Sequence, residues 1–102
     1  MMFDNHFEQK YKYKVNMTSR FKKEYKLAIK RGLDIDLLDD VIKMLADDIK
    51  LHEKYKDHDL TNNWKGFREC HVLSNWLLVY KKEKDKMILL LTRTGTHSDL
   101  DF

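Results

Sequence analysis

The sequence predicts a small α+β fold, in which a pair of helices packs on one face of a small antiparallel sheet. Apolar residues recur at helical spacing in two stretches between residues 18 and 49. The link between these stretches contains Gly32, which suits the left-handed position that ends a helix. The other apolar stretches resemble strands, and three of them follow one another with short turns. The predicted order is strand, helix, helix, strand, strand, strand.

The first strand and the two helices each carry local signals. Residues 11–17 alternate aromatic or apolar side chains with polar ones, which is typical of a half-buried strand. Thr18 or Ser19 can cap the first helix, and Asp34 or Asp36 can cap the second. The residues expected on the inner faces of the helices are Phe21, Tyr25, Ala28 and Ile29, then Leu38, Val41, Ile42, Leu45 and Ile49.

The three later strands are predicted at residues 64–73, 76–82 and 87–92, after a loop at 51–63. The last of these strands is the most apolar, so we place it near the centre of the sheet. Which of the three strands pairs with the first one stays open at this point. We expect residues 11–102 to form a single domain and residues 1–10 to be a flexible extension.

Composition narrows the class of protein further. The 102 residues contain one cysteine, Cys70, so no disulfide can form within the chain, and we expect Cys70 to be a packed core thiol. No stretch is apolar enough for a signal peptide or a membrane span, so we expect a cytoplasmic protein with no membrane partner. The formal net charge of +3, from 20 basic and 17 acidic residues, permits nucleic-acid binding without requiring it.

Three histidines are the strongest candidates for chemistry. His58 lies in the loop before the later strands, His71 near the end of a strand, and His97 just after the last strand. Each alone is most often a surface or capping residue. Together they could bind zinc, but no short paired spacing of ligands is present, so we expect no metal and no cofactor.

The residues around these histidines favour cleavage of a phosphodiester in RNA. Histidine can act as acid or base near neutral pH, and the planar guanidinium of Arg93 can bind phosphate oxygens. Lys54 and Lys56 can hold an RNA backbone, and aromatic side chains such as Trp76 can stack on an unpaired base.

Four motifs, in this order, resemble the YafQ-type branch of the RelE/ParE toxin superfamily. They are Tyr55-Lys-Asp-His-Asp-Leu60, Trp64-Lys-Gly-Phe-Arg-Glu-Cys-His71, Asn75-Trp-Leu-Leu-Val-Tyr80 and Arg93-Thr-Gly-Thr-His-Ser-Asp-Leu100. The resemblance implies a RelE-like fold and an mRNA interferase that cuts mRNA on the ribosome. It also implies a cognate antitoxin, which we expect to be small, acidic and DNA-binding. The toxin would then contact operator DNA only through this antitoxin.

The resemblance also assigns roles to individual residues. It implies that His58, His71 and His97 are catalytic, together with Arg93. Residues implied or expected to contact RNA are Lys54, Lys56, Asn75, Trp76 and Phe102.

The sequence departs from the family pattern at three places. Asn75 stands where the family commonly has an aspartate, Asp59 stands where it has a proline, and the tail ending in Phe102 is one residue longer. Two alternatives therefore stay open. One is a member of the superfamily that poisons gyrase rather than cutting RNA. The other is a weakened toxin that only binds its antitoxin or RNA.

Overall fold

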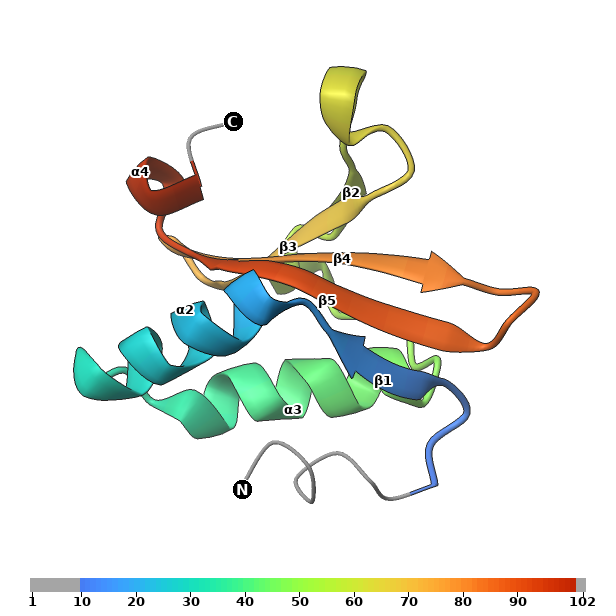
Figure 1. The fold of residues 1–102 in the computed structure, drawn as a ribbon, viewed down its shortest axis with the longest axis horizontal. Coiled ribbons are helices and arrows are strands. Elements are labelled where there is room, and N and C mark those ends of the chain that lie inside the picture. The colour runs from blue at the N-terminus through green and yellow to red at the C-terminus, as the bar shows by residue number, and fades with distance from the viewer. Residues whose placement is uncertain (1–9, 101–102) are drawn as a thin grey trace.

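The structure is a computed structural model, and it describes residues 10–100. These residues form one five-stranded sheet with two long helices on one side (Figure 1). The elements are β1 (Lys14–Met17), α2 (Ser19–Lys30), α3 (Ile35–Ala46), β2 (His58–Asp59), β3 (Arg68–Leu73), β4 (Trp76–Glu83), β5 (Ile88–Gly95) and α4 (His97–Leu100), with short 3₁₀ helices at Glu53–Tyr55 and Asn62–Trp64. Apart from Lys10, the predicted N-terminal extension lies outside the described residues, and so does Phe102.

The strand order in the sheet is β1-β5-β4-β3-β2. Strands β2 to β5 pair antiparallel, whereas β1 runs parallel to β5, with Val15 opposite Leu89. The predicted α+β class is confirmed, but the sheet is mixed rather than wholly antiparallel. No hairpin joins β1 to β5, so local sequence does not dictate the direction of that pairing. The central strand is β4, and β5 lies beside it as an interior strand.

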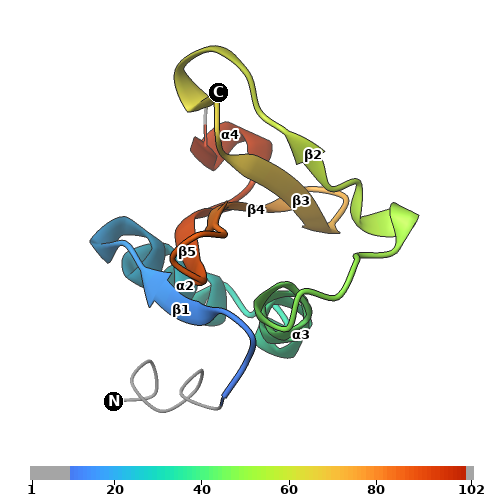
Figure 2. The same ribbon diagram turned by 90° about the vertical axis from the view of Figure 1, so that its right-hand side faces the viewer.

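Helices α2 and α3 cover one face of the sheet, as Figures 1 and 2 show. Their caps are those that the sequence allows: Thr18 accepts from the backbone of α2 and Asp34 from that of α3. Two predicted core residues are wrong. Ile29 is 41% exposed because its neighbour Ala28 takes the inward position, and Ile49 is 51% exposed because α3 ends before it.

A smaller apolar cluster covers part of the opposite face. Leu77, Val79 and Leu100 are buried there and pack against Leu60, Trp64 and Phe67. Figure 2 shows α4 and β2 on this side of the sheet, away from the two long helices. The first half of β4 is therefore buried on both faces. No helix within residues 10–100 has the length and apolar character needed to cross a membrane.

Strand β3 begins later and β5 ends later than predicted. Trp64, expected at the start of β3, lies instead in a 3₁₀ helix, and the chain turns through Gly66 at a φ of 95° before the strand begins. Strand β5 continues to Gly95, and α4 then starts at His97. Strand β5 thus leads to His97, which is the first residue of the short helix α4.

Replacement of Thr18 by alanine tests the junction between α2 and β5. The Thr18 hydroxyl accepts a hydrogen bond from the Phe21 N–H (3.0 Å) and donates one to the Thr92 carbonyl (2.8 Å). We expect Thr18→Ala to lower the free energy of unfolding by about 1–2 kcal/mol, measured by urea denaturation. Thr61→Ala is the matched control, because the Thr61 side chain makes no capping hydrogen bond. Equal stability of the two variants would contradict this account.

Candidate active site

The three predicted histidines come together in a row at one end of the sheet. The ring centroids of His58 and His71 are 6.4 Å apart, and those of His71 and His97 are 5.7 Å apart. His71 pairs with Leu77 on β4, and the partner of His58, Glu69, pairs with Val79. Because Leu77 and Val79 belong to the smaller apolar cluster, this row lies on the face of the sheet away from α2 and α3.

Each histidine ring in the row is oriented through its Nδ1. His58 Nδ1 lies 2.6 Å from the Lys56 carbonyl oxygen, and His71 Nδ1 lies 3.3 Å from the Ser74 carbonyl oxygen. His97 Nδ1 lies 2.7 Å from Asn75 Oδ1. These oxygens only accept hydrogen bonds, so each Nδ1 carries a hydrogen. In a neutral ring, Nε2 is then the nitrogen that can take a proton.

A second contact identifies the Asn75 atom beside His97 as the amide oxygen. The backbone N–H of His97 also donates to Asn75 Oδ1, at 3.1 Å. One atom that accepts from two donors must be the amide oxygen rather than the amide nitrogen. Asn75, predicted to contact RNA, therefore orients His97 in this structure.

His58 and His97 have partners of different charge. His58 Nε2 lies 3.4 Å from Glu69 Oε1, and Glu69 is 7% exposed. Both ring nitrogens of His58 therefore face an acceptor oxygen. His97 instead faces the neutral amide of Asn75.

The segment that carries His58 is clamped on both sides. Asp57 and Asp59 each accept from the guanidinium of Arg68, and the Tyr80 hydroxyl donates to Asp57 at 2.6 Å. Burial and the hydrogen bond to Asp57 raise the pKa of Tyr80 well above its usual range, so this hydroxyl stays a donor. These contacts hold the short strand β2 against β3, and thereby hold His58 near His71.

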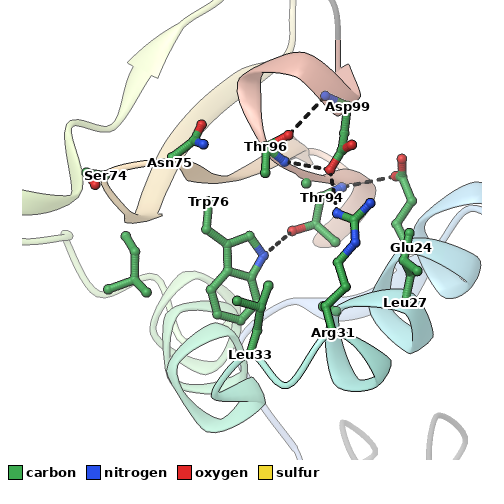
Figure 3. A pocket seen from close by; sticks show the side chains of 13 residues that line it. Glu24, Leu27, Arg31, Leu33, Ser74, Asn75, Trp76, Thr94, Thr96 and Asp99 are labelled. Atoms are coloured by element: carbon green, nitrogen blue, oxygen red, sulfur yellow. Dashed lines mark hydrogen bonds and ion pairs between the residues drawn. The ribbon is translucent and has the colours of Figure 1, made fainter.

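A capping box fixes the start of α4. The Thr96 hydroxyl accepts from the Asp99 N–H (3.1 Å), and the Asp99 carboxylate accepts from the Thr96 N–H (3.0 Å). Arg31, at the end of α2, donates to the same carboxylate at 2.8 Å (Figure 3). A Cβ on Gly95 would lie 2.9 Å from the Asp99 Cβ, so this close approach favours glycine. The contacts of Thr96, which precedes His97, and of Asp99, which follows it, therefore hold His97 in place.

The structure places Arg93 in a buried ion pair. Its Nε lies 3.0 Å from both carboxylate oxygens of Glu24, and its Nη2 lies 2.8 Å from Glu24 Oε2. Nη2 also donates to the Asp99 carbonyl at 3.2 Å, and Arg93 as a whole is 8% exposed. The guanidinium is therefore paired with protein groups in this structure, and its contact with a phosphate stays a prediction. Arg93 positions α4, and with it His97.

The structure places Trp76 in the protein core. This side chain is 3% exposed, and its indole N–H donates to the Thr94 hydroxyl at 3.0 Å. Trp76 forms one wall of a pocket of about 390 Å³ beside Asn75 and Thr96, drawn in Figure 3. The ring is thus packed in the core in this structure, and its contact with RNA stays a prediction. Phe102, the other aromatic predicted to contact RNA, lies outside the described residues.

The two predicted lysines lie beside the middle histidine. Lys54 and Lys56 line a hollow that His71 also lines, and both lysines are exposed. Lys56 has a φ of 49°, which is uncommon for a residue with a side chain. This left-handed conformation lies at the end of the Glu53–Tyr55 turn, where the Lys56 carbonyl accepts from His58.

Several residues of the site were missed by the sequence analysis. Glu69 lies two positions before His71 on the same strand, so the spacing of a carboxylate and a histidine on one strand face could have indicated it. Asp99 lies three residues after Thr96, a spacing typical of a capping box that could have indicated it, whereas Glu24 carries no such local signal. Cys70 is fully buried, as expected, and burial raises the pKa of its thiol. Within residues 10–100, no cluster of three or more histidine, cysteine or acidic side chains is arranged to hold a metal.

The ion pair of Asp99 predicts how stability depends on pH. The hydrogen bonds from Arg31 and from the Thr96 N–H lower the pKa of Asp99 from 3.8 to about 2. A carboxylate whose pKa is lowered by folding stabilises the native state above its unfolded pKa and loses this effect as pH falls through its folded pKa. We expect Asp99→Asn to destabilise the protein at about pH 7, and the difference from the wild type to shrink between about pH 4 and pH 2.

Urea denaturation at a series of pH values measures this dependence. Asp85→Asn is the control, because Asp85 lies exposed in the turn between β4 and β5. A constant difference between Asp99→Asn and the wild type at all pH values would show that the carboxylate charge is not what holds α4.

Comparison with known proteins places this fold and site in a family. Residues 13–101 match the model of a family described as "Bacterial toxin of type II toxin-antitoxin system, YafQ". The mRNA interferase toxin YafQ of Escherichia coli (strain B / BL21-DE3) is 40% identical over 87 residues, which are 84% of this chain and 92% of that protein.

Solved structures of the same kind superpose closely on this chain. YafQ in a crystal structure of the E. coli DinJ–YafQ complex is 37% identical, with a TM-score of 0.80 over 86% of this chain and 97% of that one. A metal-bound toxin from Helicobacter pylori is 41% identical, with a TM-score of 0.81 over 86% of this chain and 98% of that one. The resemblance seen in the four sequence motifs is confirmed: the chain belongs to the YafQ family of bacterial toxins of type II toxin–antitoxin systems.

Proposed function

We propose that this toxin is an endoribonuclease that cleaves mRNA on the ribosome by acid–base catalysis with histidines. The observation that carries the proposal is the row of three imidazoles, each held by its Nδ1 and spaced 6.4 Å and 5.7 Å between ring centroids. A spacing of this size lets one phosphodiester lie between the Nε2 atoms of neighbouring rings. The E. coli relative is named an mRNA interferase, which supports the same activity.

The proposed reaction begins at His97. Its Nε2 takes the proton from the ribose 2′-hydroxyl, and the 2′-oxygen attacks the adjacent phosphorus. The bond from phosphorus to the 5′-oxygen breaks, which leaves a 2′,3′-cyclic phosphate, and His71 donates a proton to the departing 5′-oxygen. His58, at the end of the row beside Glu69, stabilises the negative charge that develops on the phosphate. No step in this scheme uses a metal ion or a cofactor.

The surroundings of the row support binding of RNA rather than of a small substrate. His58 and His97 are exposed, and the exposed Lys54 and Lys56 lie beside His71 on one side of the row. Exposed lysines hold a phosphate backbone without reading its sequence. We assign residues 11–102 to one toxin domain that acts in the cytoplasm, where mRNA and ribosomes are found.

A cognate antitoxin is the proposed protein partner. One solved neighbour is a complex of YafQ with DinJ, which supports a similar pairing for this chain. The net charge of +3 suits a small acidic antitoxin, and we propose that operator DNA is contacted only through that antitoxin.

Asn75 favours a second candidate, a toxin that binds RNA or its antitoxin but cuts RNA slowly. A carboxylate at this position would stabilise the imidazolium that His97 becomes after it takes a proton. The neutral amide orients the ring but provides less of this stabilisation. We therefore propose an active enzyme in which His97 is a weaker base than it would be with an aspartate at position 75.

Substitution of the histidines tests the proposed chemistry. We expect His97→Ala and His71→Ala each to slow mRNA cleavage in a translating extract by about 10²–10⁴-fold, because each removes a proton-transfer group. His52→Asn is the control, since it removes an imidazole outside the row and keeps a residue able to cap the Glu53–Tyr55 turn. Cleavage by His97→Ala at the wild-type rate would remove His97 from the mechanism. Inhibition of purified gyrase without any RNA cleavage would replace the proposal altogether.

The pair Asn75→Asp and Asn75→Ala tests the role of the amide. We expect Asn75→Asp to cleave faster than the wild type and to move the pH–rate profile to higher pH, because the added charge stabilises protonated His97. Asn75→Ala should cleave more slowly, because the ring loses the contact that orients it. Growth arrest by Asn75→Asp, with none by the native protein, would favour the weakened toxin. Equal rates for all three proteins would show that His97 does not act as the base.

A further inference from the structure

A second feature of the active-site end is a hollow of about 330 Å³ at the edge of β3. Leu37 and Asp40 of α3 form one side, and Lys54 to Lys56 form the other. Beyond Glu69, the edge of β3 has no β2 partner, so the space between α3 and the Glu53–Tyr55 turn stays open. His71 and Leu73 complete the lining, which places this hollow directly beside the middle histidine of the row.

The lining combines apolar walls with charges of both signs. Leu37 and Leu73 are 37% and 49% exposed, and both line this hollow. The ring of Tyr55 is half-buried, with the Lys54 ammonium 5.1 Å from its centroid. A flat apolar space with an aromatic wall and nearby ammonium groups matches a nucleotide, whose base is planar and whose phosphate is anionic.

The charged groups of the hollow are available to a ligand. Asp40 and Lys56 are exposed, and within residues 10–100 neither side chain forms a hydrogen bond or an ion pair. Asp40 therefore presents a carboxylate that can accept hydrogen bonds, on the side opposite the two lysines. Lys54 and Lys56 can offset the negative charge of Asp40 when a phosphate binds near these two lysines.

We propose that this hollow binds the nucleotide next to the scissile phosphate, with its base between Tyr55 and the two leucines. The inference rests on the proposed endoribonuclease function and adds to it the subsite that reads one base. Lys54 and Lys56 contact the phosphate of that nucleotide. The scissile phosphate itself lies beyond it, at His71 and His97.

Asp40 gives this subsite a chemical preference. Adenine and cytosine carry an exocyclic amino group at C6 and C4, and guanine carries one at C2, and each can donate to a carboxylate. Uracil has carbonyl oxygens at both C2 and C4, and its one imide donor, N3–H, lies between them. A carboxylate that accepts from this N–H therefore meets a neighbouring carbonyl oxygen, which weakens the contact. The subsite therefore accepts bases with an amino group and disfavours uracil.

Titration with mononucleotides tests the subsite without any cleavage. Backbone amide signals of the full-length protein are followed by NMR as AMP, CMP, GMP or UMP is added. We expect shifts centred on Tyr55, Val72 and Leu73, and binding of UMP weaker than that of the other three by about fivefold or more. Asp40→Asn should reduce the difference in affinity between UMP and the other three nucleotides. Asp47 is an exposed acid beyond the end of α3, so Asp47→Asn should leave this difference unchanged.

The aromatic wall is tested in the same titration. Tyr55→Phe keeps the ring and should bind nearly as well as the wild type, whereas Tyr55→Leu should weaken AMP binding by about tenfold. Thermal melting shows whether each variant is folded before its affinity is compared. Absence of shifts around the hollow at millimolar nucleotide, or equal affinity for all four nucleotides in the wild type, would overturn the proposal.

Mapping of cleavage sites separates this inference from the proposed function. The ends of mRNA fragments from a translating extract are sequenced for the wild type, Asp40→Asn and Leu37→Ala, with Leu27→Ala as control on the far side of the Leu73–Ser74 turn. We expect uracil to be depleted at one position beside the wild-type cut and to return there in Asp40→Asn. Cleavage with an unchanged base preference in Asp40→Asn would refute the subsite and leave the nuclease standing. Nucleotide binding in the hollow without any cleavage by the wild type would refute the nuclease instead.

Discussion

The buried ion pair between Arg93 and Glu24 is the contact on which the rest of the active-site end depends. It joins residues 69 positions apart and links α2 to β5, while Nη2 of Arg93 also donates to the backbone of α4. The pair is sheltered from solvent, with side chains 10% and 14% exposed. Desolvation of two charges is costly, and the bidentate geometry and the additional hydrogen bonds offset that cost. Loss of either partner would leave a buried charge without compensation.

The effect of this ion pair extends to the histidine row through a short series of hydrogen bonds. Glu24 also accepts from the Thr94 N–H (3.1 Å), so it fixes the backbone three residues before His97. The Thr94 hydroxyl in turn accepts from Trp76 and donates to the Leu77 carbonyl at 2.7 Å. Strand β4, strand β5 and helix α2 are thus locked together where Asn75 and His97 meet. Arg93 and Trp76 contribute to the site from the protein interior, although sequence motifs alone suggest that they touch RNA.

The sequence was sufficient for features that depend on neighbouring residues. The helix caps at Thr18 and Asp34 and the left-handed turn at Gly32 all follow from local chemistry, and the structure has them as predicted. The gathering of three histidines also followed, because short turns in a meander bring strand ends together. The environment of individual side chains could not be predicted from the sequence. The pairing of Arg93 with Glu24, which lies far away in sequence, has no periodic signal that could reveal it.

The histidine row shows why environment matters more than residue type at such a site. Three identical imidazoles become different through one neighbour each: a buried carboxylate for His58, a backbone carbonyl for His71 and a neutral amide for His97. A carboxylate thus lies at one end of the row and a neutral amide at the other. The fold produces this difference by pairing Glu69 with His58 across β2 and β3, and by placing Asn75 at the turn that faces α4.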